Sequence, residues 1–167
     1  MENQYYYTNI YGEDYNELLK ILLQESSSFY LLTRKDDTVI NEAQKVLDRL
    51  KVFLIRRKKT NTWLTGTILK WRKIGSLFYY RTTAQSVSVL QKSASSLFDW
   101  GGVGNEEGYL THPQDIAFFN KREEPMMAVN GHEEFFIVYP SFQKEFKRFN
   151  EERGLILLQE ENKKYIY

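Results

Sequence analysis

Apolar residues recur along this chain with two periods, and each period predicts a type of element. Four segments carry apolar residues three or four positions apart, the spacing of an amphipathic helix. They cover 13–24, 40–50, 83–100 and 141–152. Short apolar runs bounded by Gly, Pro, Asn or Ser are typical of strands. The predicted strands are 29–33, 52–58, 77–81, 116–119, 126–129, 135–139 and 155–158, with a loop or hairpin at 63–71.

Helices and strands are intermixed in this order without strict βαβ alternation. That arrangement predicts an α+β domain, with a mostly antiparallel mixed sheet and about four helices packed mainly on one face. The length of 167 residues fits one domain, so we expect a single unit over 1–167. Residues 1–10 are expected to form a loosely ordered tail. The three strands within 109–139 form a predicted meander, broken at 120–125 and at Asn130-Gly131.

The composition limits the cellular compartments and the classes of protein that are compatible with this chain. Cysteine is absent, which excludes disulfides and thiolate zinc sites. The first 25 residues lack the basic and apolar regions of a secretory signal, and no apolar run has the length of a membrane span. We therefore expect a soluble, cytoplasmic protein. Aromatic residues make up 16% of the chain; most are expected in the core, and some Tyr side chains suit partner recognition at the surface.

A formal net charge of +1 hides two segments of opposite sign. Residues 49–73 contain nine basic and no acidic residues, whereas 99–134 contain eight acids and only two bases. Complementary charge accelerates protein association, so the acidic segment is a predicted partner-binding surface. The residues predicted to contact a partner protein are Asp99, Trp100, Glu106, Glu107, Tyr109, Glu123 and Glu124.

The basic segment supports a different interpretation, because Arg and Lys neutralise phosphates while an exposed Trp stacks on a base. The residues that would form such a nucleic-acid surface are Arg56, Arg57, Lys58, Lys59, Trp63, Trp71, Arg72 and Lys73. The simpler interpretation is a charged edge strand that resists aggregation.

Catalytic motifs are absent from the sequence. It contains no nucleophile elbow, P-loop or dinucleotide fingerprint, and no cofactor or catalytic residue is predicted. The two histidines, His112 and His132, lie near Asp115, Glu133 and Glu134 in sequence, which leaves a metal-dependent enzyme as a third hypothesis. Their spacing matches no metal-binding motif, so no metal ligand is predicted.

Several runs of the chain resemble a family of small, uncharacterised proteins from Firmicutes that are often labelled stage III sporulation protein AH. The similar runs are FYLLTRKDD, LDRLKVFLIRRKKTNTWLTGT, LFYYR, SLFDW, HPQDIAFF and GHEEFFIVY, within roughly residues 10–140. Three motifs carry the resemblance: Trp63 to Thr67 for a Trp-Pro-Gly-Thr element, Pro113 to Ile116 for a Pro-Glu-Asp-Leu element, and the pair His132-Glu133. Gln114 and the longer Trp-to-Gly spacing depart from the family pattern.

The resemblance implies a small, stand-alone, cytosolic protein with the profile of an immunity protein. Together with the charge pattern, it leads to a non-enzymatic protein that neutralises a partner toxin by occluding its active surface. A nucleic-acid-associated or regulatory protein that uses 49–73 is the alternative hypothesis, followed by the metal-dependent enzyme.

Overall fold

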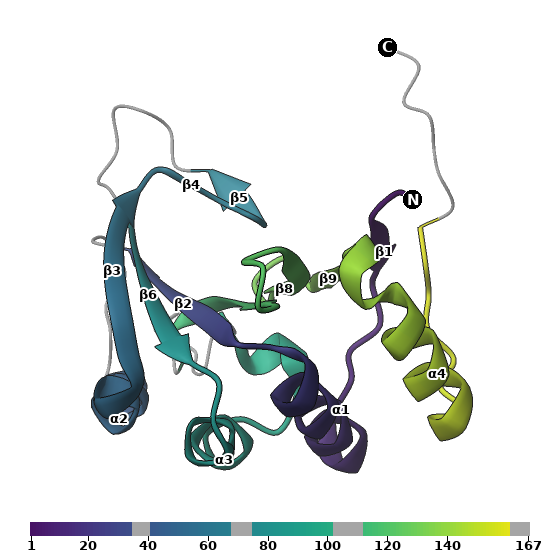
Figure 1. Ribbon diagram of the computed structural model, residues 1–167, viewed down its shortest axis with the longest axis horizontal. Coiled ribbons are helices and arrows are strands. Elements are labelled where there is room, and N and C mark those ends of the chain that lie inside the picture. The colour runs from purple at the N-terminus through teal and green to yellow at the C-terminus, as the bar shows by residue number, and fades with distance from the viewer. Residues whose placement is uncertain (35–40, 68–74, 102–111, 161–167) are drawn as a thin grey trace.

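A computed structural model describes residues 1–34, 41–67, 75–101 and 112–160. These residues form one seven-stranded antiparallel sheet and four α-helices, which confirms the predicted α+β fold (Figure 1). The strand order in the sheet is β1-β9-β8-β7-β2-β6-β3. The strands are β1 (Gln4–Tyr6), β2 (Ser28–Arg34), β3 (Leu54–Thr60), β6 (Gly75–Arg81), β7 (Gln114–Phe119), β8 (Pro125–Asn130) and β9 (Phe135–Val138). A separate short hairpin consists of β4 (Thr62–Trp63) and β5 (Gly66–Thr67).

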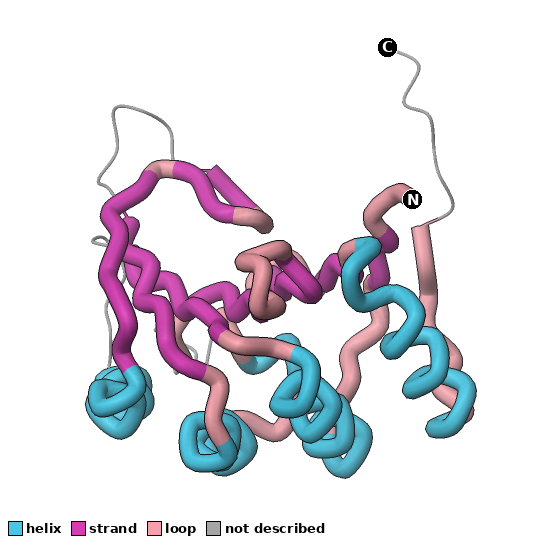
Figure 2. The backbone as a smooth tube through the Cα atoms, in the orientation of Figure 1, coloured by secondary structure: helices cyan, strands magenta, loops and turns pink. Residues whose placement is uncertain are grey.

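All four helices cover the same face of the sheet, as Figure 2 shows. They are α1 (Gly12–Glu25), α2 (Asn41–Leu50), α3 (Ala84–Ser93) and α4 (Gln143–Arg153). Helix α1 buries Tyr15, Leu18, Leu19 and Leu22, the stripe that its periodicity predicted. Helix α3 begins at a capping box, in which the Thr83 and Ser86 side chains each accept a backbone N–H of the other residue. None of the helices in the described ranges has the length and apolar composition needed to cross a bilayer.

The main core lies between the helices and the sheet. Alternate residues of the central strands, such as Phe29 of β2 and Phe118 of β7, point into it and stack 5.7 Å apart. The intervening residues point to the opposite face, which carries none of the described helices and which we call the helix-free face. A second, smaller cluster lies there, including Tyr30, Leu32 and Ile137. The β4–β5 hairpin folds over part of this face (Figure 1).

Several predicted boundaries differ from the structure. The expectation of a loose tail at 1–10 is wrong for residues 4–6, which pair with β9 as β1. The predicted strand 155–158 is not a strand; this segment is extended and joins β1 through an isolated bridge between Tyr6 and Gln159. The third helix ends at Ser93, before a separate 3-10 turn at Leu97–Asp99. Of the loop or hairpin at 63–71, residues 68–71 lie outside the described ranges.

The two edges of the sheet differ. At the β1 edge, the backbone N–H of Tyr7 donates to Leu158 O at 2.9 Å, and that of Glu160 donates to Tyr5 O at 3.0 Å. The chain thus covers this edge with its own residues 158–160. At the other edge, β3 pairs with β6, and six of its seven residues are exposed.

Candidate functional site

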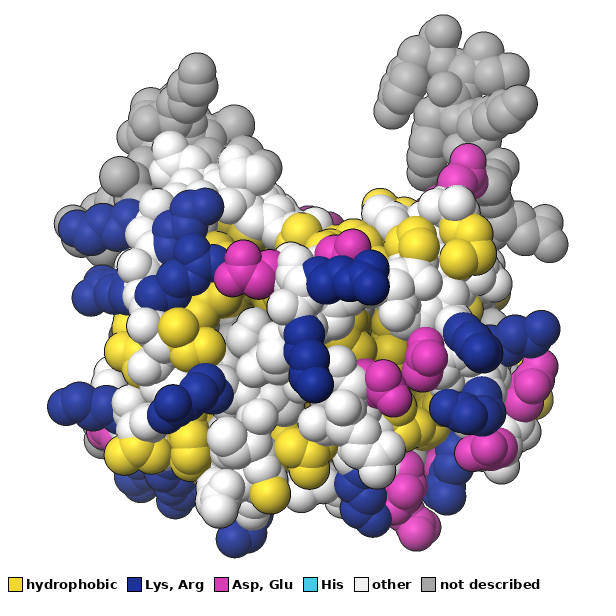
Figure 3. Space-filling view, in the orientation of Figure 1, with side chains coloured by type: hydrophobic (Ala, Val, Ile, Leu, Met, Phe, Trp, Pro, Cys, Tyr) yellow, Lys and Arg dark blue, Asp and Glu magenta, His cyan; other side chains and the backbone are white. Residues whose placement is uncertain are grey.

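A pocket with about 240 Å³ of space opens at one end of the helix-free face. It combines an arginine, a glutamate, two aromatic rings, an aliphatic side chain and a hydroxyl group. The lining residues are Ser28, Ile55, Arg56, Tyr79, Phe119 and Glu123. They come from β2, β3, β6, β7 and the turn that joins β7 to β8. In Figure 3 the surface is hollowed above the sheet, where basic and acidic side chains meet beside apolar ones.

Arg56 is placed in this pocket by the register of β3 against β6. Its strand partner is Tyr79, and its guanidinium carbon lies 4.2 Å from the centre of the Tyr79 ring. Such a cation–π contact stabilises the guanidinium over the ring. The next residue, Arg57, lies over Phe78 on the opposite face and donates to Ser76 Oγ at 3.1 Å. Strand alternation therefore divides the predicted basic surface between two faces of β3.

Three aromatic side chains form one cluster beside Arg56. Tyr30, Tyr79 and Phe119 have ring centroids 5.6–6.0 Å apart. Tyr30 is buried, whereas Tyr79 and Phe119 are half-buried. Burial raises the pKa of Tyr79, and the positive charge of Arg56 acts in the opposite direction. The rings thus form a packed aromatic floor, part of which is exposed to solvent.

Glu123 reaches the pocket from a tight turn. Its φ is 61°, and the turn is stabilised by Asn120, whose Oδ1 accepts the backbone N–H of Arg122 at 2.9 Å and of Glu124 at 3.1 Å. The Glu124 carboxylate accepts a hydrogen bond from Asn120 Nδ2 at 2.8 Å. Of these two neighbouring acids, Glu123 lines the pocket. The structure thus brings together Arg56 and Glu123, which the sequence assigned to two separate surfaces.

The β4–β5 hairpin is fixed over the helix-free face by a buried carboxylate. Asp115 Oδ2 accepts hydrogen bonds from Trp63 Nε1 at 2.7 Å and from Thr65 Oγ1 at 2.9 Å. Asn130 Nδ2 donates to Thr65 O at 3.2 Å, and Leu64 N donates to the Tyr30 hydroxyl at 3.3 Å. The Trp63 ring also lies so close to Gly66 that a Cβ there would come within 2.7 Å of it. Trp63 therefore serves to dock the hairpin.

Other predicted partner contacts have structural roles. Trp100 is fully buried, and its Nε1 donates to the Tyr15 hydroxyl at 3.1 Å. It offers no surface to a partner, so its assignment to the partner-binding surface is corrected. Asp99 is half-buried, and its carboxylate accepts the backbone N–H groups of Ser95 at 2.8 Å and Ser96 at 3.0 Å. The predicted contacts outside the described ranges are Glu106, Glu107, Tyr109, Trp71, Arg72 and Lys73.

The histidines also lie in different environments. The His112 ring contacts Ser93 O at 2.5 Å through Nε2 and lies edge-on to Trp100. His132 and its neighbours Glu133 and Glu134 are exposed in the β8–β9 turn. Within the described ranges, no three His, Cys, Asp or Glu side chains are arranged to hold a metal ion.

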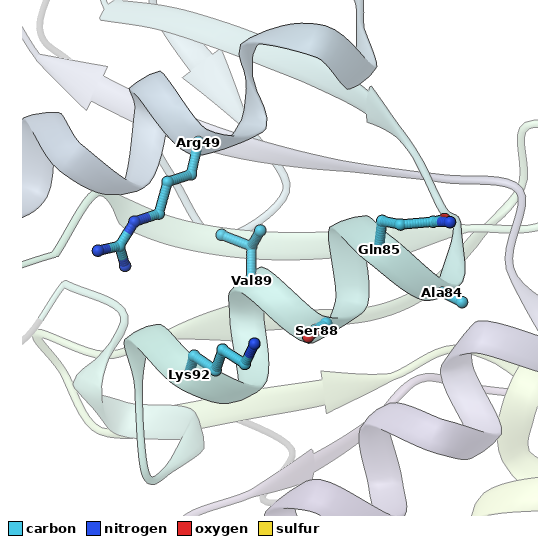
Figure 4. A pocket seen from close by; sticks show the side chains of 6 residues that line it. All are labelled: Arg49, Ala84, Gln85, Ser88, Val89 and Lys92. Carbon is cyan, nitrogen blue, oxygen red and sulfur yellow. The ribbon is translucent and has the colours of Figure 1, made fainter.

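A second, larger groove lies on the helical side, between α2 and α3 (Figure 4). It has about 620 Å³ of space and is lined mainly by α3. Arg49 of α2 and Lys92 of α3 lie on either side of Val89, with Gln85 and Ser88 farther along α3. This groove lies on the opposite side of the sheet from Arg56 and Glu123, so its lysine provides a matched control for charge changes there.

The tyrosines predict how stability responds to alkaline pH. Burial raises the pKa of Tyr139 to about 12, from an ordinary value of 10.0, and burial also raises the pKa of Tyr30 and Tyr80. The unfolded chain loses these protons first, so the stabilisation is complete below pH 10 and is lost as pH rises through about 12. We expect the free energy of unfolding in urea to fall over that interval. Tyr139→Phe should make the fall shallower, and an unchanged slope would contradict this assignment.

No protein-family model, curated protein or solved structure matches this chain. The family resemblance of its short motifs therefore remains a prediction. The residues of the helix-free face are the basis for inferring its function.

Proposed function

We propose that this chain is a non-enzymatic, immunity-type protein that binds a partner toxin and occludes the toxin's active surface. The helix-free face is its binding surface. The observation that carries this proposal is the pocket in which Arg56 and Glu123 lie together beside Tyr79 and Phe119. Arg and aromatic side chains dominate the binding energy of many protein interfaces. Such a protein would act in the cytoplasm of the cell that it protects.

The charges in the pocket favour a protein partner over nucleic acid. A phosphate bound at Arg56 would also lie close to the Glu123 carboxylate, and like charges repel. A protein surface presents acidic and basic groups side by side, so it can complement both residues at once. The mixed pocket therefore supports a protein ligand.

The rigidity of the site also suits a binding role. Arg56 lies over Tyr79, and Glu123 projects from a turn that Asn120 stabilises. Side chains already held in place lose less conformational entropy when a partner binds. The aromatic floor supports them from below, because Tyr79 packs against Tyr30 and Phe119.

We expect Arg56→Glu and Glu123→Arg each to weaken binding to the toxin roughly tenfold to a hundredfold, because each places like charge against the partner. The partner to test is the protein encoded immediately upstream of this gene. Biolayer interferometry measures the affinity, and growth of cells that express both proteins measures neutralisation. The control is Lys92→Glu, a charge reversal in the groove between α2 and α3.

Two outcomes would contradict the proposal. One is the absence of both binding and growth rescue with the upstream-encoded protein. The other is an equal loss of affinity in Lys92→Glu and Arg56→Glu, which would show that overall charge, and not the pocket, governs binding.

A second candidate function is binding of single-stranded nucleic acid, favoured by four consecutive exposed basic residues on β3, Arg56 to Lys59. Retention on immobilised poly-uridine that falls steeply with salt, and that is lost in Arg57→Glu/Lys59→Glu, would favour this function. Absence of retention at low salt would exclude it.

A further inference from the structure

We infer that the outer edge of β3 binds an extended acidic segment of the partner protein as an additional strand. This inference rests on the proposed function and specifies how the partner docks. A strand added to a sheet edge gains backbone hydrogen bonds, and its side chains determine specificity. The position, accessibility and composition of β3 each support the inference.

Among the described residues, no strand pairs with the outer edge of β3. It is the last strand of the sheet and pairs with β6 alone, through partners from Leu54–Tyr80 to Thr60–Gly75. Six of its seven residues are exposed and Thr60 is half-buried. The opposite edge of the sheet is closed by residues 158–160. Among the described strands of the sheet, β3 is therefore the one that offers a partner a free edge.

The two arginines of β3 leave this edge accessible. The guanidinium groups of Arg56 and Arg57 lie over the Tyr79 and Phe78 rings of β6, on the inner side of the strand. Arg57 is held there by its hydrogen bond to Ser76 Oγ. These side chains therefore lie over the sheet instead of covering the outer backbone groups of β3.

The composition of the edge identifies the segment that fits it. Val52, which is 74% exposed, lies in the 3-10 turn just before β3. Two exposed aliphatic side chains begin the strand: Leu54 is 41% exposed and Ile55 52%. The four basic residues Arg56 to Lys59 follow at once. Basic residues alone would be explained by protection of an edge against aggregation, but exposed aliphatic residues weaken such protection. The combination fits a partner strand with acidic residues beside 56–59 and apolar residues beside 54–55.

The edge is also continuous with the candidate site. Ile55 and Arg56 belong to β3 and line the pocket that contains Glu123. A strand paired with β3 therefore passes beside the pocket, and a side chain from the same partner can enter it. A second copy of this chain is disfavoured as the partner strand, because the two basic β3 strands would repel each other.

The test uses a synthetic peptide, Thr-Glu-Thr-Glu-Val-Thr-Val-Ile, designed to pair antiparallel with β3 from Thr60 to Leu54, with its C-terminal Ile extending beyond the strand. A control peptide has Lys in place of both Glu residues. We expect NMR titration at low salt to show that the acidic peptide shifts and protects backbone amides of 54–60, and that the basic peptide does not. Lys58→Glu/Lys59→Glu should weaken binding of the acidic peptide about tenfold or more. The matched variant Lys45→Glu/Lys92→Glu, changed at exposed lysines of α2 and α3, should stay within about twofold.

The inference is overturned if the acidic peptide protects no β3 amide, or if both double variants lose affinity equally. These results leave the proposed function in place as long as the upstream-encoded toxin still binds and still depends on Arg56 and Glu123. If the toxin does not bind at all while the acidic peptide protects β3, the docking edge is supported and the toxin assignment fails. The peptide experiment can therefore contradict the docking inference without contradicting the proposed function, and the toxin experiment can do the reverse.

Discussion

Gly131→Ala is expected to lower the free energy of unfolding by about 3 kcal/mol. Gly131 follows β8 at the start of the β8–β9 turn, directly against the backbone of 98–100. An added Cβ would lie 1.8 Å from Trp100 O and 2.7 Å from Phe98 O. Backbone atoms cannot rotate away as a side chain does, so the turn or the 3-10 segment must shift. Urea denaturation followed by tryptophan fluorescence measures the loss.

Gly154→Ala provides the matched control. Gly154 ends α4 in the left-handed region, with φ 63°, and nothing lies within 4 Å of its added Cβ. The same substitution there brings conformational strain of about 1–2 kcal/mol and no clash. A cost at Gly131 no larger than the cost at Gly154 would contradict the close approach to Trp100.

Asp115→Ala is expected to release the β4–β5 hairpin from the sheet. The substitution removes the oxygen that accepts from Trp63 Nε1 and Thr65 Oγ1. Losing two hydrogen bonds to a buried charged group costs about 3 kcal/mol, and the hairpin can avoid burying the unpaired donors only by detaching. We expect amide hydrogen exchange at 62–67 to accelerate at least tenfold, with a shift of the Trp63 fluorescence to longer wavelength.

Asp115→Asn distinguishes the loss of the hydrogen bonds from the effect of the substitution on the backbone conformation at position 115. Asn retains an acceptor oxygen, and it tolerates the positive φ of 44° at this position better than Ala does. It should therefore keep the hairpin docked, with a smaller increase in exchange. Unchanged exchange at 62–67 in Asp115→Ala would show that other contacts hold the hairpin. The affinity of both variants for the proposed partner then tests whether the docked hairpin belongs to the proposed binding surface.

The helices and the meander were predictable because their side-chain periods are local. Residues 13–24 and 141–152 carry one apolar stripe each, and the structure places α1 and α4 there. β1 was missed because it has only three residues, and its pairing with β9 depends on residues far along the chain. The run 155–158 has the composition of a strand, but only its end approaches β1. Local composition does not specify such pairings.

The candidate site was only partly predictable. Arg56 and Glu123 were each identified as charged contacts, but on separate surfaces and for different partners. The proximity of Arg56 and Glu123 depends on the strand order β7-β2-β6-β3 and on the shift in register between Leu54 and Arg56. Trp100 was assigned to the surface because it lies in the acidic segment 99–134, whereas the fold buries it against Tyr15. The positions of these side chains depend on pairing between segments far apart in the sequence, which a single sequence does not reveal.

The pairing of the first strand with the ninth constrains how this protein forms during translation. β1 is synthesised well before its two neighbours in the sheet, β9 and residues 158–160. Until then its two tyrosines, Tyr5 and Tyr6, lack the strand that they pair with. The β1 edge of the sheet therefore forms only after β9 has been synthesised, and closing so long a loop is slow.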